Sequence, residues 1–198
     1  MGKTVIFGGT FNPPHIGHIE MLKAVSKLPD VDEIWLMPAK NPPHKNTEGE
    51  LASELDRLEM CRIAAKTDPK GSASDFEYKR DGKSYTFDTL RNLKNIYPNK
   101  QFCWLVGADM LITFDKWYKY REILKMAEII AVFRKSCDKH DFEDAAIKLN
   151  GKINCVQANI TEVSSSEIRE KISGNEPVST LLDEEIYCYI KEHKLYGF

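Results

Sequence analysis

Short apolar runs alternate along this chain with segments in which apolar residues recur at a helical spacing. The runs have the length of strands, and their near-continuous apolar character is typical of strands buried on both faces of a sheet. They predict strands over residues 4–7, 33–37, 74–78, 102–106, 129–133 and 153–157. The intervening segments predict helices over residues 16–28, 54–66, 86–96, 120–126, 141–149, 165–172 and 183–193.

The order of these elements favours one architecture. Strands that alternate with helices form a parallel sheet covered on both faces, so we expect a Rossmann-like, doubly wound α/β fold. No repeat, low-complexity tract or linker interrupts the pattern, which predicts a single domain over residues 1–198. Folds of this kind bind ligands beyond the carboxyl ends of their strands.

Composition narrows the function classes. Hydrophobic residues make up 42% of the chain and charged residues 29%, as in ordinary globular proteins, and the formal net charge is −2. Such a charge favours no nucleic-acid or membrane partner, so an anion site would be local. No apolar stretch approaches the roughly 20 residues that span a bilayer. The five cysteines are widely spaced without a CxxC pair, which favours reduced thiols in the cytoplasm over disulfides or a zinc site.

The segment FGGTFNPPHIGH, residues 7–18, follows the first expected strand. Gly8 and Gly9 would turn the chain with positive φ and leave room for a ligand against the backbone. His15 and His18 are three residues apart, so they share one face at the start of the next helix. Backbone N–H groups, a helix N-terminus and two imidazoles together predict a phosphate site. The alternative is a tight turn beside two histidines of the surface or core.

A second segment, SSSEIRE at residues 164–170, follows the last expected strand. Small hydroxyl residues begin a helix and leave its first N–H groups available. Arg169 on the first turns could bind phosphate oxygens with two parallel hydrogen bonds. The alternative is an ordinary helix cap followed by an exposed arginine.

The first segment resembles the HxGH signature of the nucleotidyltransferases, which transfer a nucleotidyl group from a nucleoside triphosphate. The literal HIGH also occurs in class I aminoacyl-tRNA synthetases, but this short chain lacks a KMSKS-like lysine loop. The second segment resembles the SSTxIR signature of the adenylyltransferase branch, with Ser166 where threonine is usual. Asn12 is a second departure, because the family often has aspartate there.

Three more segments, PAKNPPHK, SYTFDTL and GADMLITFDKW, narrow the resemblance to the bacterial nicotinate mononucleotide adenylyltransferases. Taken singly, each segment could be a stiff loop, a helix cap or part of the core. The resemblance implies the nucleotidyltransferase fold, the substrates ATP and nicotinate mononucleotide, the product deamido-NAD, and Mg²⁺ as the cofactor. The sequence leaves the oligomeric state open, a homo-oligomer included.

The resemblance also implies residue roles. Catalysis would depend on His15, His18 and Arg169. ATP would contact the residues that follow several strands, namely Gly8, Gly9, Thr10, Phe11, His15, His18, Gly107, Asp109, Arg134, Ser165, Ile168 and Arg169. Of these, Arg134 could serve either phosphate group. The mononucleotide would contact His44, Lys45, Tyr85, Thr86 and Trp117.

The chemistry needs no nucleophile from the protein. A phosphate monoester has a second pKa of about 6, so it is already a nucleophile at neutral pH and can displace pyrophosphate directly. Alternatives are the nicotinamide mononucleotide enzyme, a sister transferase acting on pantetheine phosphate or glycerol phosphate, and a nucleotide sensor without turnover.

Overall fold

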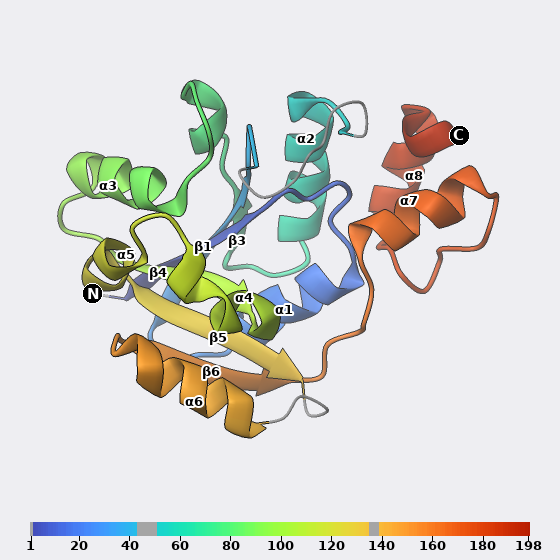
Figure 1. The fold of residues 1–198 in the computed structure, drawn as a ribbon. Helices are drawn as coiled ribbons and strands as arrows, with labels where there is room; N and C mark the ends of the chain where they lie inside the picture. The colour runs from blue at the N-terminus through green and yellow to red at the C-terminus, as the bar shows by residue number, and fades with distance from the viewer. Residues whose placement is uncertain (1, 43–50, 135–138) are drawn as a thin grey trace.

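Six parallel strands form one sheet in the computed structural model, which describes residues 2–42, 51–134 and 139–198. The strand order is β3-β2-β1-β4-β5-β6 (Figure 1). The strands are β1 Lys3–Gly9, β2 Val31–Pro38, β3 Gly71–Ala73, β4 Gln101–Gly107, β5 Glu128–Arg134 and β6 Ile153–Ala158. This order is that of a Rossmann-like doubly wound sheet, and it confirms the predicted fold class.

Helices connect consecutive strands and close the chain. They are α1 Ile16–Ser26, α2 Glu54–Ala65, α3 Thr86–Ile96, α4 Ala108–Ile112, α5 Tyr120–Met126, α6 Lys139–Leu149, α7 Ser165–Ser173 and α8 Glu184–Glu192. Three short 3-10 turns lie at Phe76–Lys79 (η1), Phe114–Lys116 (η2) and Leu195–Gly197 (η3). Within the described ranges, no helix combines the length and apolar character needed to cross a membrane.

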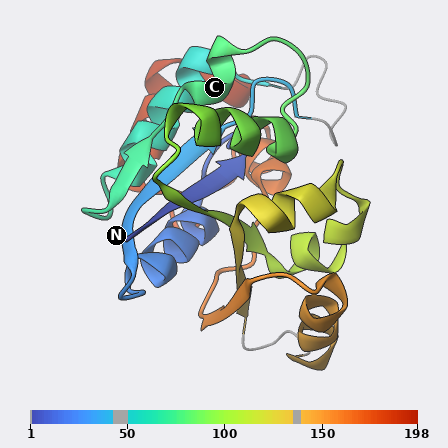
Figure 2. The same ribbon diagram turned by 90° about the vertical axis from the view of Figure 1, so that its left-hand side faces the viewer.

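The two faces of the sheet carry separate hydrophobic clusters, because side chains alternate along each strand. On β1, Val5 belongs to the first cluster and Ile6 to the second. The first cluster contains buried residues of α1, α2, α7 and α8, and the second contains buried residues of α3, α4, α5 and α6. Figure 2 shows α6 beside β6, far from α1 and α2. The sheet is therefore covered on both sides, as expected.

The strand order reverses beside the central strand β1, because β2 and β3 lie on one side of it and β4, β5 and β6 on the other. Val5 pairs with Ile34 of β2 on one side and with Cys103 of β4 on the other. In open α/β sheets, a crevice forms at such a point, beyond the carboxyl ends of the two adjacent strands whose connections run to opposite sides. The predicted phosphate segment leaves the sheet at this crevice.

The strand predicted over residues 74–78 is wrong. The edge strand β3 is Gly71–Ala73, and the chain then turns into η1. Two side chains of the expected strand have partners outside the sheet. The ring of Tyr78 lies under the Arg57 guanidinium at 5.4 Å, and Glu77 accepts a hydrogen bond from Thr89 of α3 at 2.5 Å. These contacts override the alternating pattern of the sequence.

Candidate active site

The turn after β1 is built differently from the sequence-based expectation. Gly8 and Gly9 do not have positive φ and lie inside the strand, whereas Phe11 has a φ of +48°. The glycines are needed for close packing instead. A Cβ on Gly8 would lie 2.5 Å from the Trp104 ring, and a Cβ on Gly9 would lie 3.0 Å from the Phe11 ring. The positive-φ prediction was therefore wrong, and the backbone at this turn is closely packed by two aromatic rings.

The two histidines lie at the start of α1. His15 is the N-cap residue, and its ring lies 3.7 Å from that of His18, centroid to centroid, with 34° between the planes. The expectation that they share one face is confirmed. The backbone N–H of His15 donates to Nδ1 of His18 at 3.2 Å. Because Nδ1 accepts a hydrogen bond, the proton of the neutral His18 ring is on Nε2, which makes Nε2 a donor for an anion.

Other parts of the chain pack against the N-terminus of α1. The backbone N–H of Ile16 donates to the carbonyl of Leu181 at 3.0 Å, so this N–H is already used within the protein. A Cβ on Gly17 would lie 3.0 Å from the carbonyl oxygen of Thr161, whose backbone N–H donates to Glu20 at 2.6 Å. The glycine of HIGH therefore lets the segment before α7 approach α1 closely.

The second predicted segment lies beside the first. Ser164 caps α7, since its hydroxyl accepts from the backbone N–H of Glu167 at 3.1 Å. The Ser165 hydroxyl donates to the carbonyl of Pro13 at 2.8 Å, and Nη1 of Arg169 donates to the carbonyl of Asn12 at 3.1 Å. The start of α7 is therefore hydrogen-bonded directly to the loop after β1.

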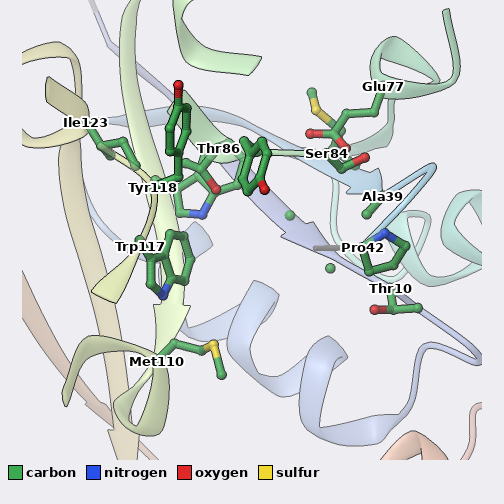
Figure 3. Close-up of a pocket in the computed structure, with 15 residues that line it drawn as sticks. Thr10, Ala39, Pro42, Glu77, Ser84, Thr86, Met110, Trp117, Tyr118 and Ile123 are labelled. Atoms are coloured by element: carbon green, nitrogen blue, oxygen red, sulfur yellow. The ribbon is translucent and has the colours of Figure 1, made fainter. Parts of the chain in front are cut away.

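A cavity of about 200 Å³ lies at the crevice beside β1 (Figure 3). Its walls come from the ends of β1, β2 and β4 and from the segments around α3 and η2. The lining residues are Gly8, Gly9, Thr10, Met37, Ala39, Pro42, Glu77, Ser84, Tyr85, Thr86, Trp104, Met110, Trp117, Tyr118 and Ile123. The structure thus brings three predicted ATP-side residues together with three predicted mononucleotide-side residues.

One wall of this cavity is aromatic. Trp117 stacks on Phe114 with 4.7 Å between centroids and 28° between planes, and Phe114 is fully buried. Tyr85 and Tyr118 lie 4.8 Å apart by the same measure. In Figure 3, Trp117 and Met110 lie across the cavity from Thr10 and Pro42. A ring held in this way is suited to stack on a planar ligand.

The N-terminus of α3 is at the same wall. Its N-cap residue, Tyr85, makes no side-chain capping hydrogen bond. The one acidic residue of the first turn, Asp88, pairs instead with Arg91 at 2.9 Å. The first-turn N–H groups near Thr86 therefore keep their partial positive charge for an anionic ligand group.

Several predicted site residues lie elsewhere. Phe11 and Ile168 are buried in the first hydrophobic cluster and do not line the cavity. Gly107 is the N-cap of α4, with exposed Asp109 in the first turn. Arg134 ends β5 and pairs with Glu162 at 2.8 Å. His44 and Lys45 are outside the described residues.

A second cavity, of about 630 Å³, contains the predicted arginine. It lies between the loop before α2, helix α7 and the C-terminal turn η3. Its lining residues are Leu51, Ala52, Ser166, Arg169, Glu170, Ser173, Lys194, Leu195 and Tyr196. Neither histidine lines either cavity.

A buried cation below these loops was not predicted from the sequence. Arg57 of α2 is only 1% exposed. Its Nη1 donates to the carbonyls of Thr10 at 3.1 Å and Ala39 at 2.6 Å, which follow β1 and β2. Arg57 therefore ties together two loops that line the first cavity. An arginine at a core position of an amphipathic helix was the available signal, because such a residue is rarely buried without partners.

The cavity wall also contains residues that were not predicted to contact a ligand, among them Glu77, Ser84, Trp104, Met110 and Tyr118. Tyr118 follows Trp117 directly and could have been found from that neighbour. Glu77 could not, because a glutamate in a surface-like segment gives no sign that Thr89 will hold it inside.

The four cysteines of the described ranges show no sign of nucleophilic chemistry, and Cys137 lies outside those ranges. Burial raises the pKa of Cys103 to about 12 and raises that of Cys61 further, so both stay protonated at neutral pH. Cys155 and Cys188 are exposed and also free. Across the part of the chain that the structure describes, no group of three His, Cys, Asp or Glu side chains could hold a metal ion.

The fold, the crevice and the two linked segments define a nucleotidyltransferase. A model of the cytidylyltransferase-like family matches residues 6–171, and the chain belongs to that class of enzymes. The nicotinate-nucleotide adenylyltransferase of Bacillus subtilis is 37% identical over 196 residues, which cover 99% of each chain. A probable nicotinate-nucleotide adenylyltransferase of Carboxydothermus hydrogenoformans is 39% identical over 198 residues, covering 98% of each. Within the class, the chain therefore belongs to the nicotinate-nucleotide adenylyltransferase family.

A solved structure agrees with this assignment at the level of the fold. Nicotinic acid mononucleotide adenylyltransferase of Plasmodium falciparum, complexed with NaAD, superimposes with a TM-score of 0.83. That match covers 100% of this chain and 98% of the other at 21% sequence identity.

Proposed function

We propose that the protein transfers the adenylyl group of ATP to nicotinate mononucleotide, giving deamido-NAD and pyrophosphate. One observation carries the proposal. The Trp117 ring and the uncapped N-terminus of α3 lie across a single cavity from the loop after β1. A planar ring with a negative substituent would fit the side of the cavity formed by Trp117 and the N-terminus of α3. Phosphates would fit the side formed by the loop after β1. The names of the relatives support the same pair of substrates.

The reaction would be a direct displacement. A phosphate oxygen of the mononucleotide forms a bond to the α-phosphorus of ATP. The bond from that phosphorus to the oxygen that bridges the α- and β-phosphates breaks. Pyrophosphate leaves with the electron pair of the broken bond. Because the attacking phosphate is already an anion at neutral pH, the protein has to position the two substrates and neutralise charge.

His15, His18 and Arg169 would neutralise this charge. A donor at Nε2 of His18 and the guanidinium of Arg169 can each bind oxygens of the triphosphate, and these bonds strengthen as the leaving group gains charge. Mg²⁺ would enter bound to ATP as part of the substrate. Its ligands would be phosphate oxygens and water, since hard divalent cations prefer oxygen and this site presents mainly cationic and N–H groups.

The acid would be preferred over the amide. A carboxylate can accept from the first-turn N–H groups of α3 with both oxygens, whereas a carboxamide directs its own NH₂ donors against other donors. Each unpaired buried group costs about 1–3 kcal/mol, so two of them give a preference of roughly 10²-fold.

A pyrophosphate-release assay tests the proposal with ATP and each of nicotinate mononucleotide, nicotinamide mononucleotide and phosphopantetheine. We expect the largest kcat/KM with nicotinate mononucleotide. Equal or larger values with nicotinamide mononucleotide would assign the protein to the amide branch, and turnover of phosphopantetheine alone would assign it to a sister transferase. ATP binding with no turnover of any acceptor would identify a nucleotide sensor.

We place the enzyme in the cytoplasm. The free thiols of Cys61, Cys103, Cys155 and Cys188 support this, because such thiols persist in a reducing compartment.

A further inference from the structure

The C-terminal turn η3 is hydrogen-bonded to the loop after β1. The phenol of Tyr196 donates to Oδ1 of Asn12 at 2.8 Å, which joins residues 184 positions apart in the sequence. Asn12 is only 3% exposed. Burial raises the pKa of the Tyr196 phenol, so the hydroxyl keeps its proton and remains a donor. The last turn of the chain is thus part of the surroundings of the phosphate loop.

Asn12 connects two other parts of the site. Its Oδ1 also accepts from the backbone N–H of Ala52, just before α2, at 3.0 Å. Its carbonyl oxygen accepts from Nη1 of Arg169 at 3.1 Å. A shift of Asn12 would therefore move the loop and the arginine that we assign to the triphosphate at the same time.

The backbone of η3 is held in an uncommon conformation. Tyr196 has a φ of +61° and Lys194 a φ of +50°, a region that residues other than glycine seldom occupy. Such a conformation costs free energy and persists only where the surroundings impose it. Tyr196 and Leu195 pack against the first hydrophobic cluster, and η3 contacts α7 and α8. The phenol is therefore held in place, and Tyr196 lines the second cavity together with Arg169.

We propose that Tyr196 is a positioning residue for ATP binding, acting through Asn12 on the loop after β1 and on Arg169. The inference rests on the proposed function for the role of Arg169. Tyr196 itself need not contact the reacting atoms. It supplies the hydrogen bond that fixes Asn12 from the C-terminal end of the chain, while Ala52 fixes it from α2.

The test is Tyr196→Phe, which removes the hydroxyl and keeps the ring. We expect the dissociation constant of a nonhydrolysable ATP analogue, measured by calorimetry, to rise roughly five- to tenfold, the effect of one lost hydrogen bond. The KM for ATP should rise in parallel, while the KM for the mononucleotide stays within about twofold.

Tyr189→Phe is the matched control. Its hydroxyl donates to Asp56 of α2 at 2.9 Å, so this variant, like Tyr196→Phe, loses one phenol hydrogen bond made by the C-terminal region, but to α2 and not to the loop after β1. It does not touch Asn12. We expect a similar loss of thermal stability with unchanged affinity for the ATP analogue. If Tyr196→Phe behaves in the same way, Tyr196 has a purely structural role and the inference is overturned.

A double-mutant cycle locates the effect. In an Asn12→Ala background, Tyr196→Phe should change the affinity for the analogue by less than about twofold, because the shared contact is already gone. Additive effects of the two mutations would overturn the inference.

The binding measurement does not depend on the identity of the mononucleotide, so it separates this inference from the proposed function. Wild-type protein that binds the analogue without turning over nicotinate mononucleotide would contradict the function alone. Wild-type protein that does not bind the analogue would overturn both.

Discussion

Nδ1 of His18 accepts a hydrogen bond from the backbone N–H of His15, the N-cap residue of α1, so His18 presents Nε2–H as a donor. We expect His18→Ala to lower turnover by roughly 10²–10³-fold, the usual cost of removing one donor to a developing negative charge. The circular dichroism spectrum should be unchanged. His193→Ala, at the exposed end of α8, is the control and should keep wild-type turnover. Near-normal turnover of a folded His18→Ala protein would remove His18 from the catalytic residues.

Arg57 matters for stability, because it is buried and donates hydrogen bonds to the loops after β1 and β2. We expect Arg57→Lys to lower the free energy of unfolding by about 2 kcal/mol or more, since lysine cannot reach both carbonyls and bonds from a charged donor contribute about 1.5–3 kcal/mol. Urea titration measures the change. Arg62→Lys, exposed on the same helix, should cost far less, and equal losses for the two variants would contradict this account.

At the scale of single residues, the sequence predicts which segments form the site better than it predicts where each side chain points. Tyr85, Thr86 and Trp117 were assigned to one ligand from the family resemblance, and they line one cavity. Phe11 and Ile168 belong to the same segments as other candidate residues, but their side chains point into the core. The direction depends on tertiary packing, such as the ring of Phe11 against Gly9, which no local pattern encodes.

Helix α3 depends on an ion pair to keep its first turn available. Arg91 pairs with Asp88, so the carboxylate does not cap the N–H groups near Thr86. We expect Arg91→Ala to release Asp88 toward these groups and to lower the acid-to-amide ratio of kcat/KM several-fold.

Helix α2 offers a matched control for this variant. Arg62 and Glu59 form an exposed pair of the same spacing at 2.8 Å, away from the cavity. Arg62→Ala should leave the acid-to-amide ratio unchanged. A ratio that also stays unchanged in Arg91→Ala would mean that the first turn of α3 does not select the acid.

Helix boundaries were predicted well where a capping or stop residue was present. Helix α3 matches its predicted range of residues 86–96, and Ser53 caps α2 through the backbone N–H of Asp56 at 3.1 Å. The short helix α4 was missed because five residues carry too little periodicity to be recognised. The edge strand was misplaced because an edge has a single pairing partner, so contacts of Tyr78 and Glu77 outside the sheet decided its length.

At the scale of the whole molecule, the two exposed thiols of the described residues lie apart from both cavities. Cys155 is on the edge strand β6 and Cys188 is on α8, and neither lines the two cavities. We expect a small thiol-modifying reagent to label both without lowering turnover by more than about twofold, because the proposed displacement has no covalent step. Mass spectrometry confirms the labelling. Loss of activity in proportion to modification of either cysteine would contradict the direct displacement.

The first cavity lies at the boundary between the two halves of the sheet. Gly8 and Gly9 belong to the central strand, Ala39 follows β2, and Trp117 comes from the connection beyond β4. Ligands bound in this cavity would touch all of these segments and act as a non-covalent cross-link that the unfolded chain does not have. At a hundred times its dissociation constant, a ligand adds about 2.7 kcal/mol to stability. Each correct substrate should therefore raise the melting temperature by several degrees, so a simple heating experiment can rank candidate acceptors before any turnover is measured.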